Sequence, residues 1–298
     1  MSCFKTLWRK IAPNPLDQRL RKVRGERILI TWNRGLGDIP LGLYALVHRI
    51  REFIPKAQIT FLTRQDLQDG FSLLYDVTAV ACVHWRRGVA FDLDDTLAQH
   101  QLARSSFDLI LENPDPTYWV NWQLGSLVPR LKWDQAWDAL QAPFLGEGSY
   151  IGVHVQTETV YGYEKNWPLT QWRELFSKLT ALGFRVLLFG FQPTDDFVMG
   201  GVTDLRGRTN LFEMLSIIKN RCTHLIVPDS GVLSLTYYLD VQFPIRIVSL
   251  WADPRQGVLK QNVPSPNKAL QHIPLLGRSE NLSTLSVEEV MKALEVLC

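Results

Sequence analysis

The 298-residue sequence has little cysteine and no long hydrophobic run. Its four cysteines form no CxxC pair and lie far apart, which is typical of reduced thiols rather than of a disulfide framework or a structural zinc site. No apolar stretch approaches the roughly 18 residues that suggest a transmembrane helix, and no secretory signal pattern is visible. These absences lead us to expect a cytoplasmic protein.

The sequence also lacks a strong net charge and a cluster of metal ligands. Its formal net charge is +2, which does not predict binding to nucleic acid. Its six histidines form no HExxH motif and no group with cysteine, so no metal site is expected. Hydrophobic residues make up 46% and charged residues 21% of the chain, as in globular proteins, and the length allows two domains.

Positive charge is concentrated near the N-terminus. Residues 1–27 contain eight lysines and arginines but only two acidic residues, so the rest of the chain carries a net negative charge. Phe4 and Trp8 stand among these charges. We expect the segment 1–24 to be a basic arm. It either contacts an anionic surface, such as the cytoplasmic face of the inner membrane, or packs an aromatic side chain on the neighbouring domain.

Strand-like and helix-like segments alternate along the chain, as in parallel sheets joined by crossover helices. A segment rich in alanine, proline and glycine, 141–149, separates two such sets. We therefore predict an α/β protein of two Rossmann-like domains, 25–148 and 149–298, with parallel sheets that face each other across a cleft. The C-terminal helix, opened by a capping box of Ser286 and Glu289, is a candidate to pack back on the first domain. The predicted strands are 27–32, 59–63, 79–85, 107–111, 150–155, 185–189, 225–227 and 245–251.

One candidate site follows the first predicted strand, in Gly35-Leu36-Gly37-Asp38. The two glycines permit a tight turn, and a carboxylate at a helix start can cap free backbone N–H groups. The segment is not a dinucleotide-binding fingerprint, because Pro40 stands where the third glycine is needed. Asp38 is therefore either a helix cap or a general base that accepts a proton from a bound hydroxyl, with Arg34 in the same loop.

A second candidate site lies in the other half of the chain. Asp229-Ser230-Gly231 follows an apolar strand and begins a helix, where unpaired N–H groups and a partial positive charge suit a phosphate. Lys165 and Thr157 stand in the loop after an earlier strand and can add donors to a diphosphate. The alternatives are an ordinary helix cap and a solvent-exposed lysine beside a packed tryptophan.

Four motifs occur in one order along the chain. They are Gly35-Leu36-Gly37-Asp38, then Lys165-Asn166-Trp167-Pro168 with Trp172, then Leu205-Arg206-Gly207-Arg208-Thr209-Asn210-Leu211, then Asp229-Ser230-Gly231 with Ala252-Asp253-Pro254. With these motifs the sequence resembles the ADP-heptose:lipopolysaccharide heptosyltransferases, a GT-B glycosyltransferase family, over roughly residues 27–275.

The resemblance implies metal-independent, inverting transfer of a sugar, with no cofactor. The donor is a nucleotide-sugar, ADP-heptose being usual for the family, and the acceptor is a lipopolysaccharide core or another lipid-linked glycan. Asp38 matches the proposed base and Lys165 the lysine that contacts phosphate. The resemblance implies a donor site made of Thr157, Asp229, Ser230 and Gly231, and an acceptor-side loop of Arg34, Gly35 and Gly37. Asp195, Thr209 and Ser234 are further donor-site candidates.

Three departures from the family pattern leave other functions open. Ser234 and Leu235 stand where the family often has a histidine after the Asp-Ser-Gly motif, so a sugar-nucleotide-binding protein without turnover is an alternative. The residues before Leu36-Gly37-Asp38 also differ, and 160–164 lengthen the donor loop.

A separate motif predicts different chemistry. Asp92 and Asp94 match the DxDxT opening of haloacid-dehalogenase-like phosphatases and the metal-binding DxD of GT-A glycosyltransferases, or they mark an acidic helix start. Of the ten tryptophans, Trp167 and Trp251 are the best candidates to stack on a sugar.

Overall fold

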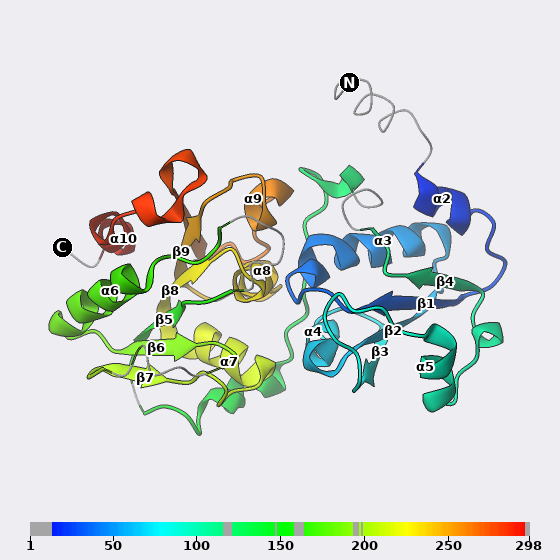
Figure 1. Ribbon diagram of the computed structural model, residues 1–298, viewed down its shortest axis with the longest axis horizontal. Helices are drawn as coiled ribbons and strands as arrows, with labels where there is room; N and C mark the ends of the chain where they lie inside the picture. Colours follow the sequence, from blue (N-terminus) through cyan, green and yellow to red (C-terminus); the bar gives the residue numbers. More distant parts are fainter. Residues whose placement is uncertain are drawn as a thin grey trace. The chain divides into compact units, whose positions relative to one another are not determined.

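The computed structural model describes residues 14–115, 121–146, 148–157, 164–192, 197 and 199–295. The chain divides into two compact units, of which the first ends at Gln123 and the second begins at Leu124. Each unit is built on its own sheet of parallel strands, and helices connect the strands (Figure 1). The predicted α/β class with two parallel sheets is confirmed.

The first unit contains a four-stranded sheet in the order β3-β2-β1-β4. All three strand pairs are parallel. The central strand β1 is buried from Ile28 onward, as expected for a strand with both faces covered. Its strands are β1 (Arg27–Trp32), β2 (Gln58–Arg64), β3 (Val77–Cys82) and β4 (Leu109–Glu112). Its connecting helices are a π-helical turn (Ile39–Leu43) that continues into α3 (Tyr44–Phe53), then α4 (Gln68–Phe71) and α5 (Leu93–Gln99).

A short helix near the N-terminus, α2 (Pro15–Leu20), belongs to the first unit. Leu16 and Leu20 are buried, and Asp17 forms an ion pair of 2.6 Å with Arg49 of α3. The predicted basic arm, 1–24, therefore contains a docked helix in its second half, because two leucines at helical spacing bury together there. Residues 1–13 lie outside the described part.

The second unit contains a six-stranded parallel sheet in the order β10-β9-β8-β5-β6-β7. Its strands are β5 (Tyr150–His154), β6 (Val186–Phe189), β7 (Val202–Asp204), β8 (Cys222–Pro228), β9 (Ile245–Trp251) and β10 (Leu270–Leu276). Its helices are α6 (Leu169–Ala181), α7 (Leu211–Arg221), α8 (Gly231–Tyr238), α9 (Gly257–Gln261) and α10 (Val287–Leu294). The strands β7 and β10 were not predicted, because these two edge strands have no continuous apolar run.

The C-terminal helix α10 packs on the second sheet. Val290 and Met291 of α10 lie in one core cluster with Phe176 of α6 and Val248 of β9, and Figure 1 shows α6 and α10 next to each other. The capping box of Ser286 is present as predicted. The apolar face of this helix is used within its own unit. That the helix also packs on the first domain stays a prediction.

The segment 124–148 packs with the second unit, although it was predicted to end the first domain. Trp137 stacks on Phe212 of α7 with ring centroids 4.3 Å apart, and Asp138 pairs with Lys219 at 2.7 Å. These contacts join residues more than 70 positions apart, so the local composition of 141–149 did not reveal them. The chain passes between units near Gln123 instead of at the predicted linker.

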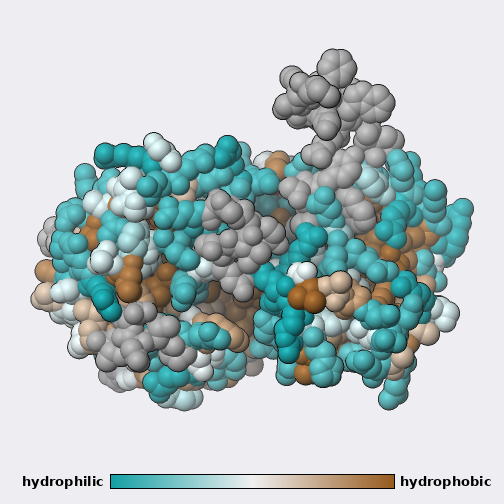
Figure 2. Space-filling model, viewed as in Figure 1, coloured by the Kyte–Doolittle hydropathy of each residue, from teal (hydrophilic) through white to brown (hydrophobic). Residues whose placement is uncertain are grey.

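The visible surface is largely hydrophilic, with apolar side chains in small separate patches (Figure 2). Phe191, after β6, is the most exposed large hydrophobic side chain of the described residues at 79%. Among those residues, no helix combines the length and the apolar character that crossing a bilayer requires.

Candidate active site

The second unit places the start of α8 directly after the buried strand β8. Ser230 is the N-cap of α8, and its Oγ accepts a hydrogen bond of 3.3 Å from the backbone N–H of Leu233. Asp229 and Ser230 are almost fully buried, and Gly231 is the first helical residue. The remaining N–H groups of the first turn and the helix dipole make this point attractive to an anion. The predicted strand-to-helix turn is therefore present.

Lys165 lies against this helix start. Its Nζ is 2.9 Å from Oδ2 of Asp229, and both side chains are mostly shielded from water, at 17% and 8% exposure. This ion pair places the Lys165 ammonium group beside the N-terminus of α8 and holds the Asp229 carboxylate in place. An arriving diphosphate would meet the ammonium group and the helix N–H groups together.

Asn166 explains why Lys165 reaches this position. Its Oδ1 accepts a hydrogen bond of 2.9 Å from the Thr157 backbone N–H, and its Nδ2 donates one of 3.0 Å to the Thr157 carbonyl oxygen. One amide thus joins Asn166 to the Thr157 backbone; residues 158–163 lie outside the described part of the chain. Thr157 and Lys165 are brought together by these two hydrogen bonds. We name Thr157, Lys165, Asp229, Ser230 and Gly231 the α8 site.

The other donor-site candidates differ in their positions. Thr209 is half-buried and precedes Asn210, the N-cap of α7; the same loop contacts Gly190 after β6 through a 3.0 Å bond from the Gly207 N–H. Ser234 lies one turn inside α8, buried, and its hydroxyl donates to the Ser230 carbonyl oxygen at 3.1 Å. Ser234 therefore supports the α8 site from within the helix. Asp195 lies outside the described residues.

The two tryptophans considered for sugar stacking are core residues. Trp167 is 2% exposed, donates its indole N–H to the Leu285 carbonyl oxygen at 2.9 Å, and packs edge-on against Trp172. Trp251 is 1% exposed. Neither ring offers a free face to a sugar, so this expectation is corrected. Both rings are buried in the hydrophobic core of the second unit.

In the first unit, Asp38 follows the strand β1 and is half-buried. Its Oδ2 accepts a hydrogen bond of 3.0 Å from the Gly35 backbone N–H, whereas it forms no side-chain cap to the helix that it precedes. The carboxylate thus closes the turn from Gly35 to Asp38 instead of capping the helix. A Cβ on Gly35 would lie 3.1 Å from that oxygen, so the close approach favours glycine.

Arginines gather at the carboxyl ends of the strands around Asp38. Arg87 Nη2 lies 3.8 Å from the position of a Cβ on Gly35. Burial lowers the pKa of Arg64, which ends β2; Asp66 opposes this change, while the nearby charges of Arg87 and Arg86 add to it. Only Arg34, which lies over the Trp32 ring at 5.3 Å, was predicted from the sequence. The other three share a recognisable signal, since each stands at or just after a strand end.

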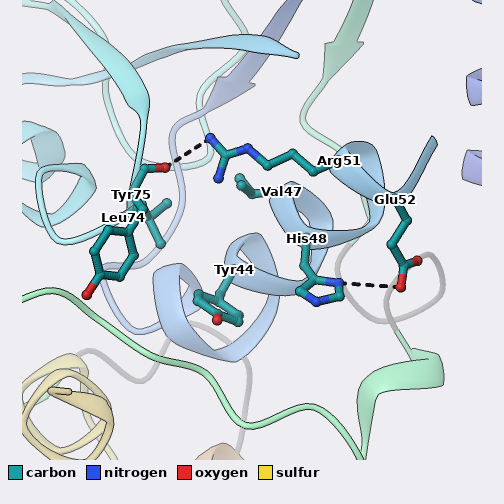
Figure 3. Close-up of a pocket in the computed structure, with 7 residues that line it drawn as sticks. All are labelled: Tyr44, Val47, His48, Arg51, Glu52, Leu74 and Tyr75. Carbon is teal, nitrogen blue, oxygen red and sulfur yellow. Dashed lines mark hydrogen bonds and ion pairs between the residues drawn. The ribbon is translucent and has the colours of Figure 1, made fainter. Parts of the chain in front are cut away.

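A separate hollow of about 320 Å³ lies on the first unit (Figure 3). Its walls come from α3 and from the turn before β3. His48 faces Glu52 at 3.6 Å, and Arg51 donates to the Tyr75 carbonyl oxygen at 3.0 Å. It contains none of the predicted site residues. The lining residues are Tyr44, Val47, His48, Arg51, Glu52, Leu74 and Tyr75.

The DxDxT segment forms an acidic helix start. Asp92 is the N-cap of α5, where its Oδ1 accepts a bond of 3.0 Å from the Asp95 N–H, and Asp94 pairs with Arg104 at 2.6 Å. No group of three or more metal-ligating side chains occurs within the described residues. The local geometry therefore fits the structural interpretation of this segment.

Solved structures with the same fold come from glycosyltransferases. A family 9 glycosyltransferase from Veillonella parvula is 16% identical, with a TM-score of 0.63 over 93% of this chain and 98% of that one. ADP-heptose lps heptosyltransferase II of E. coli is also 16% identical, with a TM-score of 0.63 over 91% and 98%. The E. coli heptosyltransferase WaaC, solved with ADP, is 18% identical, with a TM-score of 0.55 over 90% and 99%. These similarities establish the GT-B fold.

A sequence comparison identifies the family. No curated protein matches the chain. Residues 91–257, more than half of the chain, match glycosyltransferase family 9 (heptosyltransferase). That range includes Lys165 and the whole start of α8. The chain therefore belongs to glycosyltransferase family 9.

Proposed function

We propose that this protein transfers a sugar from a nucleoside diphosphate sugar to a lipopolysaccharide core or a similar lipid-linked glycan, with inversion and without a metal ion. The observation that carries the proposal is the 2.9 Å pair of Lys165 and Asp229 at the start of α8. A lysine, an Asp-Ser-Gly helix start and a Thr157 backbone held by Asn166 together form a site for a diphosphate.

The donor binds to the α8 site with its diphosphate at the helix start. Lys165 shares its charge between Asp229 and the departing diphosphate, so negative charge that develops on the leaving oxygen is stabilised. The Thr157 loop end adds a hydroxyl donor nearby. ADP-heptose is the first donor to test, because a similar structure, that of the dodecameric heptosyltransferase TibC, was solved in complex with ADP-D-beta-D-heptose.

Asp38 acts as the general base. The acceptor hydroxyl oxygen attacks the anomeric carbon, the bond from that carbon to the diphosphate oxygen breaks with its electron pair, and the hydroxyl proton passes to the Asp38 carboxylate. The bond from the Gly35 N–H uses one carboxylate oxygen, Oδ2, and holds the group in a defined orientation. Oriented groups of this kind also reduce the entropic cost of the transition state.

The arginines near Asp38 support an acceptor that carries negative charge. Arg64, Arg86 and Arg87 are close enough for their charges to affect one another, and like charges held together favour binding of an anion. Carboxylate or phosphate groups of a lipopolysaccharide core fit this description. The basic residues of segment 1–24 add a peripheral contact with an anionic membrane on the cytoplasmic side to the proposal.

A panel of nucleotide-sugars tests the function. Release of nucleoside diphosphate is measured with and without a core-oligosaccharide acceptor, in EDTA and in magnesium. The expected result is acceptor-dependent release that EDTA does not change. Donor binding without release with any acceptor would favour a sugar-nucleotide-binding protein. Magnesium-dependent phosphate release that Asp92→Asn abolishes would favour the phosphatase.

A further inference from the structure

The tryptophan Trp251, at the end of β9, is tied into a short chain of buried hydrogen bonds. Its Nε1–H donates to Oγ of Ser249 at 2.6 Å, and Ser249 Oγ lies 2.7 Å from Nε2 of His272 on the neighbouring strand β10. Ser249 is fully buried. The side chains of Trp251, Ser249 and His272, on two paired strands, thus form one chain of hydrogen bonds near the carboxyl ends of these strands.

The direction of the hydrogen bond from Trp251 is fixed, whereas that of the bond between Ser249 and His272 depends on the tautomer of the imidazole. An indole N–H can only donate, so Ser249 Oγ accepts from Trp251 and has its own proton left for His272. Burial lowers the pKa of His272 to about 4, so the imidazole is neutral near pH 7 and Nε2 can accept that proton. The ring of Tyr237, from α8, packs edge-on against His272 at 5.1 Å and limits its movement.

The far edge of Trp251 reaches the α8 site. A Cβ placed on Gly257 would lie 2.8 Å from Cη2 of Trp251 and 2.3 Å from Oδ1 of Asp229. The indole and the Asp229 carboxylate therefore both lie against Gly257, with no room for a side chain at that position. The other oxygen of that carboxylate pairs with Lys165 at 2.9 Å.

We propose that Ser249 and His272 are positioning residues for the donor: they fix the Trp251 indole, which with Gly257 holds the Asp229 carboxylate in register with Lys165. This inference rests on the proposed function of the α8 site. Neither residue touches the donor. Their effect is on the donor and not on acceptor binding, because the groups proposed to bind the acceptor belong to the other unit.

The test compares Ser249→Ala with a matched control, Ser265→Ala. Ser265 is half-buried, donates a hydrogen bond of 2.6 Å to the Tyr237 carbonyl oxygen and accepts one of 3.0 Å from the Asn267 N–H. Its replacement also removes a hydrogen-bonded hydroxyl but leaves the bonds of Trp251 in place. We expect Ser249→Ala to raise the donor KM about fivefold to tenfold. We expect kcat to fall much less than in Lys165→Ala and the acceptor KM to stay nearly unchanged, and Ser265→Ala to change neither KM.

His272 variants separate hydrogen bonding from packing. His272→Gln keeps an oxygen that can accept from Ser249, so its donor KM is expected to return toward the wild-type value, whereas His272→Leu should behave like Ser249→Ala. The indole N–H signal of Trp251 in ¹⁵N-labelled protein, identified by its loss in Trp251→Phe, reports the arrangement without any substrate. It should move in Ser249→Ala and His272→Leu, and stay in place in Ser265→Ala.

An unmoved Trp251 signal in Ser249→Ala, or a donor KM equal to that of Ser265→Ala, overturns the inference. If the wild-type protein neither binds nor turns over any nucleotide-sugar, the proposed function fails. A Trp251 signal that still moves in Ser249→Ala would then show that Ser249, His272 and Trp251 contribute to folding alone, which also overturns their role in donor binding. Movement of the signal together with a selective rise in donor KM supports both.

Discussion

Lys165 and Asp229, 64 residues apart in the sequence, form an ion pair of 2.9 Å at the start of α8. Lys165 comes from the segment that Asn166 joins to the Thr157 backbone, and Asp229 from the end of the central strand β8. Because the loop after β5 and the end of β8 belong to neighbouring parallel strands, both side chains lie at the same sheet edge. The first prediction follows from this pair.

Replacing Lys165 with alanine should weaken both donor binding and turnover. A charge-assisted contact of this kind contributes about 1.5–3 kcal/mol, so kcat/KM for the donor is expected to fall about 10- to 100-fold. Steady-state kinetics with varied donor measures the change. The matched control is Lys178→Ala, which removes an exposed lysine paired with Glu174 at 2.8 Å on the same unit. Unchanged kinetics in Lys165→Ala would show that the ammonium group does not contact the donor.

Asp38→Asn should fold normally and bind the donor, but lose turnover. The amide oxygen of asparagine can still accept the hydrogen bond from the Gly35 N–H, so the turn is preserved, whereas the basic oxygen is lost. General base catalysis is worth about 10²- to 10⁴-fold, and kcat should fall by that factor. Donor binding is followed by calorimetry and turnover by diphosphate release. Asp69→Asn, which changes an exposed carboxylate in the first turn of α4 of the same unit, is the control. A variant with wild-type kcat would remove Asp38 from the mechanism.

Gly257→Ala should destabilise the second unit and weaken donor binding together. Gly257 has φ +49, and a Cβ there would lie 2.3 Å from Oδ1 of Asp229. Backbone strain and overpacking each cost about 1–3 kcal/mol. Gly183→Ala separates the two causes, because Gly183 has φ +82 but open space around its Cβ position. Thermal unfolding and donor titration are measured for both, and only Gly257→Ala should lose donor affinity.

Stability should fall as the solution is acidified through the range of two buried histidines. Burial lowers the pKa of His154 and of His272 from 6.5 to about 4. Between these values the unfolded chain binds protons that the folded chain does not, so the free energy of unfolding decreases as pH falls from about 6.5 toward about 4. Each histidine contributes at most about 3 kcal/mol to this loss.

Urea unfolding at a series of pH values measures this dependence. His154→Gln and His272→Gln should each have a flatter profile between pH 4 and 6.5 than the wild type. The exposed His84 provides the control, since His84→Gln should keep the wild-type slope. Parallel profiles for all four proteins would contradict the assignment of these two histidines as neutral buried groups.

Central and edge strands differ in how well they could be predicted. β9 was predicted to its exact residues, and β5 and β6 to within one residue, because each is mostly apolar and almost entirely buried. The edge strands β7 and β10 alternate between half-buried and exposed residues, so no such run marks them. The boundary between units was predicted too late because Trp137 finds its partner, Phe212, in a distant helix.

The residues of the candidate site were visible in the sequence, but their partners were not. Asp38 and Asp229-Ser230-Gly231 each stand at a junction of strand and helix, a local pattern that glycine, serine and aspartate mark clearly, and Lys165 stands in the loop before α6. The functions of Asn166 and Gly257 depend on contacts with residues elsewhere in the chain. Likewise, Arg64 at the end of β2 comes close to Arg86 and Arg87 after β3 only when those two strands pair.

The sequence by itself determined where strands turn into helices and which reactive side chains stand at those turns, because backbone preferences and capping act over a few neighbouring residues. The tertiary structure alone decided that Lys165 faces Asp229, that Trp251 is buried against Gly257, and that Ser234 serves its own helix. Such pairings depend on the order in which parallel strands assemble. The order of the strands is set by how the apolar faces of the sheets and helices are buried, and it cannot be read from any short stretch of sequence.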